Sequence, residues 1–546
     1  MKVQLRRDAN TIESRHEVMS KPMKLPIGIQ EFEKLRNDGY VYLDKTPLIW
    51  KMVNEGCYYF LSRPRRFGKS LLMSTIQAFF EGKKHLFDGT IGQPLFIATD
   101  EEVEWSWEPH PIMHLDLNAQ KYDCAEALDH VIEDFLSEQE SLYGKRESEC
   151  GFGLRFTGVL ERAYKQTGKR VVILIDEYDK PLLQAIGNKE LQTEFRNTLK
   201  AFYGALKSAD GSIRFALLTG VTKFGKVSVF SDLNNLKDIS MLPKYHSICG
   251  VEEKDLRTQL SEGVQRLADE YNQTLEEAYD KMRLLYDGYH FCEGNLPGLY
   301  NPFSVLNTLD NLVYRSYWFE TGTPTYLATL LVRHNWNLDA MANADVDVDV
   351  LNSVDSESTN PIPVIYQSGY LTIKDYDEDF GLYKLGFPNK EVENGFVKFL
   401  IPYYLGKQEP STSAFDIRQY IQDIRQGNTD QFVLRMKSLF ADTPYELIKD
   451  LENHYQNQVW LFHKLLGMYV QAEYHTSDGR IDMVLQTTQF CYVVEFKFDG
   501  SAQEALDQIH SKDYPLPFAL NGQKVIRVGM NISSKTRNID ECLVEK

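Results

Sequence analysis

The feature that most constrains the fold is a short apolar run that leads directly into a turn rich in basic residues. Residues 58–62 have the composition of a buried β-strand, and residues 71–80 beyond the turn have helical character. The turn itself reads Arg-Pro-Arg-Arg-Phe-Gly-Lys-Ser over residues 63–70. A strand, a turn of this kind and a helix place backbone N–H groups at a helix N-terminus, where they bind phosphate. The chain must therefore fold so that a buried strand ends beside a helix N-terminus.

The turn predicts an ATP site. Lys69 is expected to reach the β and γ phosphates, and Ser70 to bind Mg²⁺. Arg63 stands where the usual pattern Gly-x(4)-Gly-Lys-[Ser/Thr] has its first glycine, so the three arginines are expected either to grip phosphate or to contact a partner or another domain. The predicted nucleotide contacts in this turn are Arg63, Arg65, Arg66, Phe67, Gly68, Lys69 and Ser70.

A second apolar run, residues 171–175, ends in Asp176 and Glu177. A carboxylate at the end of a buried strand suits the Mg²⁺ shell, and the next one suits polarising the attacking water. The alternative is a helix cap followed by a surface residue. Thr219 ends the next apolar run, where it is either a polar sensor of the γ-phosphate or a plain strand end.

Strand-like and helical segments alternate in this half of the chain. The expected strands are 58–62, 112–117, 171–175 and 214–219, and residues 190–207 form an amphipathic helical stripe. Such alternation predicts a parallel sheet with helices on both faces. The expected fold class is therefore α/β, with the architecture of a P-loop NTPase.

At 546 residues the chain is too long for one core. We expect a tail over 1–22, a P-loop ATPase domain over 23–250, a helical and winged-helix-like region over 251–440, and a third domain over 441–546. An acidic linker is expected near 339–363, and a small hairpin over 365–392. In the last domain a helix near 452–469 precedes strands, one more helix and a final strand at 525–530.

Two strand-like runs in the last domain flank a polar turn at residues 487–489. If the turn is centred between Thr488 and Gln489, Asp482 lies opposite Glu495, and Lys497 shares the face of Glu495. Two close carboxylates and a lysine suit Mg²⁺ and phosphodiester hydrolysis. The alternative is a solvated sheet face with a cross-strand salt bridge. Further candidate site residues are Glu452, Glu473 and Gln508.

Composition limits the partners. The net charge is −18, and residues 441–546 hold 15 acidic and 10 basic side chains. Because affinity for nucleic acid comes largely from Lys and Arg, any such contact must be local. Seven scattered cysteines suggest neither a disulfide framework nor a zinc site. No apolar run is long enough for a membrane span or a secretory signal, so we expect a cytoplasmic protein.

These motifs together resemble a bacterial family, the AAA-ATPase-like proteins with a C-terminal PD-(D/E)XK nuclease superfamily domain. The resemblance covers about residues 23–546. Its marks are Leu25–Gly28, Ser62–Ser70, Leu174–Asp179, Tyr286–Tyr289, Tyr300–Phe303, Gly479–Asp482 and Glu495–Lys497. It implies that arginine at position 63 is the family's own variant. It also implies that the last domain has an α/β restriction-endonuclease-like fold. The acidic and lysine positions of the nuclease superfamily would then fall on Asp482, Glu495 and Lys497.

Three functions are compatible with these patterns. The first is an ATPase coupled to a metal-dependent nuclease, with ATP and Mg²⁺ as cofactors, Glu177, Asp482, Glu495 and Lys497 as catalytic residues, and DNA favoured over RNA as substrate. The second is a nucleotide-switched regulator or defence sensor whose C-terminal domain only binds a partner, which the acidic charge favours. The third is an ATP-driven remodeller that loads another machine onto DNA through the hairpin at 365–392. Self-association is left open.

Overall fold

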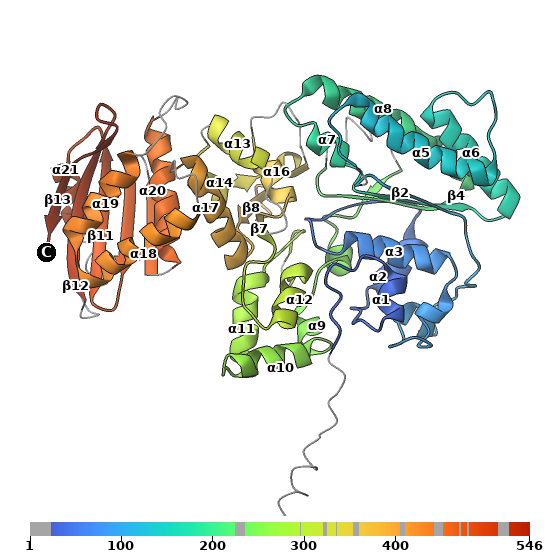
Figure 1. Ribbon diagram of the computed structural model, residues 1–546, viewed down its shortest axis with the longest axis horizontal. Helices are drawn as coiled ribbons and strands as arrows, with labels where there is room; N and C mark the ends of the chain where they lie inside the picture. The colour runs from blue at the N-terminus through green and yellow to red at the C-terminus, as the bar shows by residue number, and fades with distance from the viewer. Residues whose placement is uncertain are drawn as a thin grey trace, which may run out of the picture.

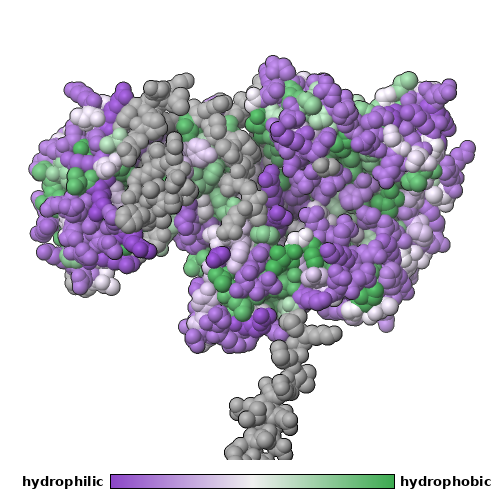
Figure 2. Space-filling model, viewed as in Figure 1, coloured by the Kyte–Doolittle hydropathy of each residue, from purple (hydrophilic) through white to green (hydrophobic). Residues whose placement is uncertain are grey.

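A computed structural model describes residues 23–118, 120–223, 235–294, 296–319, 325–334, 336–352, 360–404, 410–441, 451–468, 471–477, 480–511 and 523–546. An α/β unit, a helical middle region and a second α/β unit follow one another along the chain (Figure 1). The expected tail over 1–22 lies outside the described residues. Hydrophilic residues dominate the visible face (Figure 2). Within the described ranges, no helix is both long and apolar enough to cross a bilayer.

The first unit contains a five-stranded sheet in the order β2-β3-β4-β1-β5, with every strand pair parallel. Because β1, β3 and almost all of β4 are buried, these strands are apolar runs without alternation. The four strands expected from the sequence are present. The strands are β1 (Tyr58–Ser62), β2 (Ile112–Asp116), β3 (Val171–Asp176), β4 (Ile213–Gly220) and β5 (Lys237–Asp238).

Helices cover both faces of this sheet, as expected (Figure 1). The helical stripe over 190–207 is confirmed: it lies in α8, and Phe202 stacks on Phe156 of α6 with ring centroids 4.6 Å apart. One face carries α1 (Phe32–Asn37), α2 (Thr46–Glu55) and α3 (Lys69–Phe80), and the other carries α5 (Ala125–Tyr143), α6 (Phe152–Thr167) and α8 (Lys189–Ser208). The short helices are α4 (Phe96–Thr99) and α7 (Lys180–Gln184).

The middle region begins with four helices that share a separate hydrophobic core, built around Leu256, Leu267, Met282 and Leu309. They are α9 (Glu253–Arg257), α10 (Ser261–Glu270), α11 (Leu275–Tyr286) and α12 (Pro302–Asn311). Further along the chain lie α13 (Thr325–Arg333), α14 (Leu338–Ala342), α15 (Val348–Asn352), α16 (Ile362–Gln367) and α17 (Lys390–Tyr404).

The expected linker over 339–363 is wrong for the residues that the structure describes there. β6 (Asp345–Val346) pairs with β8 (Leu382–Gly386), which also pairs with β7 (Thr372–Asp377), giving a three-stranded antiparallel sheet. Val346 and Leu351 are buried. Alternating aspartates keep every second residue at the surface, so an acidic composition coexists with a packed segment. The expected hairpin is therefore part of a larger sheet.

The C-terminal sheet has the order β13-β12-β11-β10-β9, with β11 and β12 parallel and the other pairs antiparallel. In the β10–β11 hairpin Asp482 pairs with Glu495, which is the register expected from the turn. The expected helix near 452–469 is α20 (Leu451–Gly467). The remaining elements are β9 (Gln471–Ser477), β10 (Arg480–Gln486), β11 (Phe490–Phe498), α21 (Ala502–Ser511), β12 (Lys524–Ser533) and β13 (Asn538–Glu545).

Two features of this unit differ from expectation. The strand expected at 525–530 is not the last one, because β13 follows it. In addition, α18 (Pro410–Gln426) and α19 (Thr429–Ala441) pack on this unit although they precede residue 441. Tyr492 of β11 donates a hydrogen bond to the carbonyl of Ile424, 2.9 Å, and its ring centroid lies 6.2 Å from that of Phe432. The core of the C-terminal unit thus includes helices from the expected middle region.

Candidate functional site

The turn after β1 has the backbone shape of a phosphate-binding loop. Gly68 adopts φ 94°, a left-handed conformation that glycine adopts without strain, and α3 begins at the next residue. The first N–H groups of α3 have no partners within the helix, so they are available to an anion. Lys69 and Ser70 lie in this first turn. The backbone therefore supplies the cradle that the sequence predicts.

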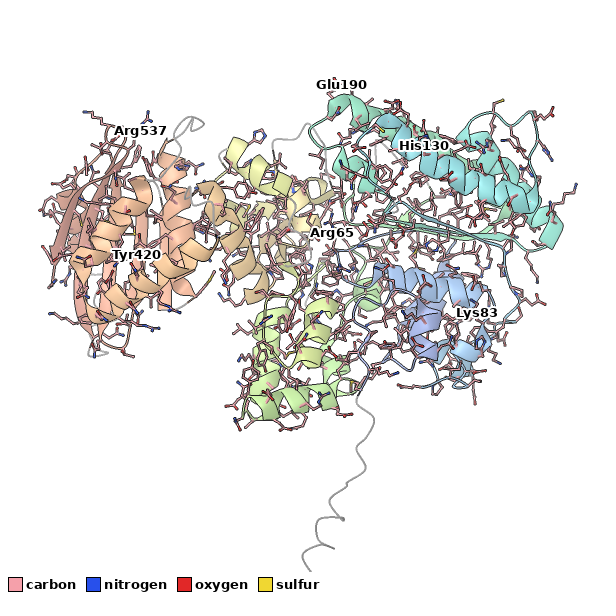
Figure 3. The ribbon with its side chains drawn as sticks, in the orientation of Figure 1. Arg65, Lys83, His130, Glu190, Tyr420 and Arg537 are labelled. Carbon is pink, nitrogen blue, oxygen red and sulfur yellow. The ribbon has the colours of Figure 1, made fainter. Side chains whose placement is uncertain are left out.

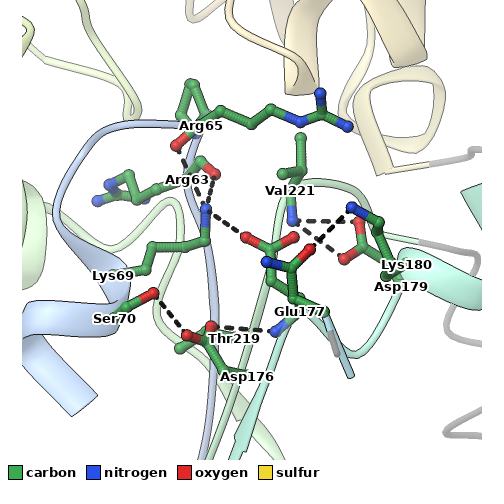
Figure 4. Close-up of polar contacts among 12 residues, drawn as sticks. Arg63, Arg65, Lys69, Ser70, Asp176, Glu177, Asp179, Lys180, Thr219 and Val221 are labelled. Atoms are coloured by element: carbon green, nitrogen blue, oxygen red, sulfur yellow. Dashed lines mark hydrogen bonds and ion pairs between the residues drawn. The ribbon is translucent and has the colours of Figure 1, made fainter. Parts of the chain in front are cut away.

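The Lys69 side chain lies under the arch of the loop, with its ammonium between the loop backbone and Glu177 (Figure 4). Its ammonium donates to the carbonyl oxygens of Arg63, 3.0 Å, and Pro64, 3.3 Å. It also lies 3.7 Å from a carboxylate oxygen of Glu177. The Lys69 side chain is 5% exposed, so these oxygen atoms stabilise its buried positive charge. Phosphate oxygens can take their place when a nucleotide binds.

Asp176 is the centre of the polar contacts at the strand ends (Figure 4). One carboxylate oxygen accepts a hydrogen bond from the Ser70 hydroxyl, 2.7 Å, and the other accepts from the Thr219 hydroxyl and from the Glu177 N–H, 3.0 Å. Thr219 is fully buried, so its hydroxyl is part of the site rather than a plain strand end. A hydroxyl and a carboxylate are the hard oxygen ligands that suit Mg²⁺. These residues fit that ion.

Glu177 follows directly in a left-handed conformation, φ 52°. A non-glycine residue in this region is uncommon and directs its side chain away from the run of the strand. Here the carboxylate turns toward Lys69 and the open side of the loop (Figure 4). The structure therefore brings together all five residues expected to act at the triphosphate: Lys69, Ser70, Asp176, Glu177 and Thr219.

The structure corrects the prediction that Arg63 contacts phosphate, because its guanidinium is buried away from the cleft. It is 1% exposed, and its guanidinium donates to the carbonyl oxygens of Ser240, 2.7 Å, and His246, 3.3 Å. It also stacks on the ring of Phe291 at 4.2 Å. Burial without a carboxylate partner lowers the pKa of Arg63. Arginine replaces the usual glycine because it fastens the loop to residues more than 170 positions away in the sequence.

The other three residues of the turn divide between two roles. Phe67 is buried against Tyr289 and Phe291, so its side chain anchors the loop. Arg65 and Arg66 are exposed and line the cleft beside Lys69. Arg66 also lies 5.1 Å from the ring of Phe303, and Figure 3 places Arg65 where the first unit meets the middle region.

The cleft in front of the loop has a volume of about 320 Å³. Three polar side chains that sequence reasoning missed line it together with the predicted ones: Asp116, Asn118 and Lys180. Lys180 donates to the Asn118 side chain, 2.8 Å. The pKa of Asp116 is raised, first by desolvation and then by the negative charge of Asp176. The expected strand ending at Leu117 held the only signal, a carboxylate at its carboxyl end.

A second, mainly apolar pocket of about 90 Å³ adjoins the cleft. The two share Pro26, Gly68, Leu71, Pro302 and Leu306. Its far wall carries Lys45, which forms ion pairs with Glu252, 3.5 Å, and Asp255, 3.6 Å. The pocket therefore lies between the N-terminal segment, α3 and the first helices of the middle region, beside the phosphate cradle.

The second candidate centre lies on β11. Glu495 is 1% exposed; one of its carboxylate oxygens lies 3.3 Å from the Lys497 ammonium, and the other has no hydrogen-bond partner among the residues that the structure describes. A buried oxygen of this kind suits a cation. Lys497 also donates to the side-chain oxygen of Gln508 on α21. The suggestion that Gln508 faces this site is therefore correct.

The other candidates at this centre are placed only in part. Asp482 lies opposite Glu495 in the backbone register, and Glu473 pairs with Val484 on the same face, but the side chains of Asp482 and Glu473 lie outside the described residues. Glu452, at the start of α20, lines one small cavity with Lys497. The geometry thus supports Glu495, Lys497 and Gln508 as one cluster, with Glu452 near its edge.

Comparison with known proteins identifies the domains that contain the two centres. Residues 26–230 match the family described as predicted AAA-ATPase, and residues 450–542 match the PD-(D/E)XK nuclease superfamily. An uncharacterized protein in the vnfD 5'region of Azotobacter chroococcum mcd 1 is 32% identical over 96% of this chain and 99% of its own length. A solved structure, the Aeropyrum pernix ORC1 protein in complex with DNA, matches with 11% identity and a TM-score of 0.23, over 65% of this chain and 91% of that one. The chain belongs to the family of predicted AAA-ATPases that carry a C-terminal domain of the PD-(D/E)XK nuclease superfamily.

Proposed function

We propose that this protein binds and hydrolyses ATP with Mg²⁺, and that its nucleotide state governs metal-dependent cleavage of nucleic acid by the C-terminal domain. The observation that carries the proposal is the joint placement of Lys69, Ser70, Asp176, Glu177 and Thr219 around one cleft. DNA is favoured over RNA as the substrate, and the cytoplasm is the expected location.

Each residue of the first centre has a separate task in ATP hydrolysis. The α3 N-terminus and Lys69 hold the β and γ phosphates, and Ser70 and Asp176 hold the metal that neutralises phosphate charge. Glu177 orients and polarises the attacking water, and Thr219 reports the state of the γ-phosphate to β4. The apolar pocket beside Gly68 takes the base, since it adjoins the phosphate cleft and is lined largely by hydrocarbon.

At the second centre Glu495 and Asp482 would hold a divalent ion, and Glu495 would contribute the carboxylate oxygen that Lys497 does not contact. Lys497 bears the positive charge that stabilises developing negative charge on phosphate, and Gln508 fixes its position. A divalent ion held there would lower the pKa of a bound water, which would then be available as the nucleophile.

A nucleotide-switched regulator that cuts nothing is the second candidate. The observation in its favour is charge: the chain carries −18 overall, and the turn between β7 and β8 carries carboxylates at Asp377, Glu378 and Asp379. An acidic turn repels the phosphate backbone. The same turn argues against the remodeller, which would use this hairpin as its DNA contact.

The deciding experiment is a cleavage assay of the full chain on single- and double-stranded DNA and RNA, with Mg²⁺ or Mn²⁺, and with and without ATP. We expect cleavage that depends on metal and on ATP. Glu495→Gln should abolish cleavage and leave ATP hydrolysis intact, because only the C-terminal metal loses a ligand. Glu177→Gln should keep ATP binding and lose hydrolysis, and Lys69→Ala should lose binding.

The two activities are separable by these variants. If the parent hydrolyses ATP but cleaves none of the four substrates with either metal, the regulator replaces the nuclease. If Lys69→Ala binds ATP as tightly as the parent does, the proposed nucleotide site is wrong.

A further inference from the structure

We propose that Asp116 is a second carboxylate of the Mg²⁺ site, which accepts hydrogen bonds from water bound to the metal beside Asp176. The inference rests on the proposed ATP binding and names a positioning residue that the motifs of the chain do not include. It concerns the edge strand β2 and not the phosphate loop itself.

The sheet register puts the two carboxylates side by side. β2 and β3 are parallel, and Asp116 pairs with Asp176 at the last position of both strands. Neighbouring strands lie about 4.8 Å apart, and paired residues direct their side chains to the same side of the sheet. Thr219 contacts Asp176 from β4, on the other side of β3. Asp116, Asp176 and Thr219 therefore form a polar row across three strand ends.

These three side chains lie on the face of the sheet that α3 covers. His114, two residues before Asp116 and on the same face of β2, contacts the Gln77 side chain of α3 at 3.0 Å. Ser70 lies in the first turn of the same helix, where its hydroxyl donates to Asp176. Asp116 lines the cleft that Lys69 and Ser70 also line. Its side chain therefore opens toward the place where the metal would sit.

The position of Asp116 suits water-mediated contact rather than direct ligation. Asp176 already bonds to Ser70, whereas Asp116 lies one strand further from the loop. Mg²⁺ loses its water reluctantly and usually keeps several bound molecules. An outer carboxylate that accepts from such water orients it and adds charge complementarity.

Asp116 also has a competing structural role in the turn that follows β2. The Asn118 N–H donates to Asp116, 2.8 Å, which shapes the turn after β2. Asp116→Asn separates the two roles, because the amide oxygen can still accept from Asn118 while the charge is gone. Asp123→Asn is the matched control: Asp123 is exposed, pairs only with Lys121 at 2.8 Å, and does not line the cleft.

The test measures binding of a non-hydrolysable ATP analogue to the full chain by calorimetry, with Mg²⁺ and with EDTA. In the parent and Asp123→Asn, Mg²⁺ should tighten binding. In Asp116→Asn the increase in analogue affinity caused by Mg²⁺ should be about tenfold smaller than in the parent, which is the usual effect of losing a partner of a metal ligand. Binding in EDTA should be unchanged or tighter, because a negative charge beside the triphosphate has been removed.

If Mg²⁺ increases the affinity of Asp116→Asn for the analogue as much as it does in the parent, the proposal is wrong. An equal loss of affinity with Mg²⁺ and with EDTA would also overturn it and assign Asp116 to the turn alone. A parent that binds no nucleotide in either condition would refute the proposed ATP function itself, so the two failures are distinguishable.

Discussion

Asp179 shows how a single buried carboxylate can fix the geometry next to the ATP site. It is fully buried and accepts hydrogen bonds from the backbone N–H groups of Val221, 3.1 Å, and Thr222, 2.6 Å, and from the Thr222 hydroxyl, 2.6 Å. These bonds hold the segment that follows Thr219. Burial, and next the charge of Glu177, raises the pKa of Asp179 to about 6.

This shift predicts a dependence of stability on pH. Folded Asp179 binds its proton more tightly than the unfolded chain does, so its contribution is fully present below pH 3.8 and is lost as pH rises through about 6. Asp179→Asn removes the titrating group. Between about pH 4 and 6, the free energy of unfolding measured in urea should fall less steeply in the variant. The difference should be a few kcal/mol at most, since one pKa unit corresponds to about 1.4 kcal/mol.

An exposed carboxylate provides the control for this measurement. Asp123→Asn should leave the slope of the parent unchanged. Identical slopes in the parent and in Asp179→Asn would show that Asp179 does not titrate in this range.

At the scale of residues, the sequence predicts what is local and misses what depends on topology. Lys69 and Ser70 follow from one strand, one turn and one helix, and Asp176 from the end of an apolar run. Asp116 could not be predicted as a site residue, because the local sequence does not indicate which strand lies next to β3 in the sheet. Arg63 was assigned to phosphate because the partners that bury its side chain lie far away in the sequence.

At the scale of elements, the sequence predicts the exact pairing of Asp482 with Glu495 in the β10–β11 hairpin, because a short turn fixes the register of both strands. The segment at 345–352 was not, since its pairing with β8 joins residues almost 40 positions apart. α18 and α19 were assigned to the wrong unit for the same reason. Their amphipathic pattern reports a buried face but not the sheet that buries it.

The packing of α18 and α19 makes a prediction about fragments. The nuclease superfamily match begins at residue 450, yet Tyr420 packs on Phe462 of α20 with ring centroids 4.8 Å apart, and Phe432 packs near Tyr492. A fragment of residues 450–546 exposes these aromatic surfaces, whereas one of 410–546 keeps them covered. We expect a cooperative thermal transition by circular dichroism only for the longer fragment, or a lower midpoint and aggregation for the shorter one.

A substitution in the full chain checks the same point without cutting it. Phe432→Ala should destabilise the C-terminal unit by about 3–5 kcal/mol, the usual cost of emptying a buried phenylalanine site. Equal thermal midpoints for the two fragments would mean that α18 and α19 belong to the middle region.

At the scale of the whole molecule, the middle region contacts both the phosphate loop and helix α20 of the C-terminal unit. The Trp318 indole N–H donates to the Arg65 carbonyl in the phosphate loop, 3.1 Å, and the Lys223 N–H beyond β4 donates to the Gln367 side chain of α16, 2.5 Å. On the other side, Asn457 and Gln458 of α20 form hydrogen bonds that join the C-terminal unit to the middle region. Both α20 side chains are at most 1% exposed. Hydrogen bonds thus connect the middle region to the phosphate loop on one side and to α20 on the other.

If ATP governs the C-terminal domain, part of the signal should pass through Gln367. Bound γ-phosphate acts on Thr219, the segment after it continues to Lys223, and Gln367 holds the Lys223 backbone while donating to the Leu351 carbonyl. Gln367→Met removes both bonds but keeps a side chain of similar size. We expect ATP binding within a few-fold of the parent, together with a reduced ATP-dependent change in hydrogen exchange in α17 and α20.

Hydrogen exchange on the full Glu177→Gln chain, with and without Mg²⁺ and ATP, measures this response free of turnover. Gln265→Met is the matched control, because Gln265 is exposed and bonds only to Asp269 on the next turn of α10. The parent and this control should show the same ATP-dependent protection in α17 and α20. If Gln367→Met shows it too, the coupling bypasses α16, and it then passes through the direct contacts of the phosphate loop with the middle region, such as the Trp318 bond to Arg65 and the packing of Phe67 on Tyr289.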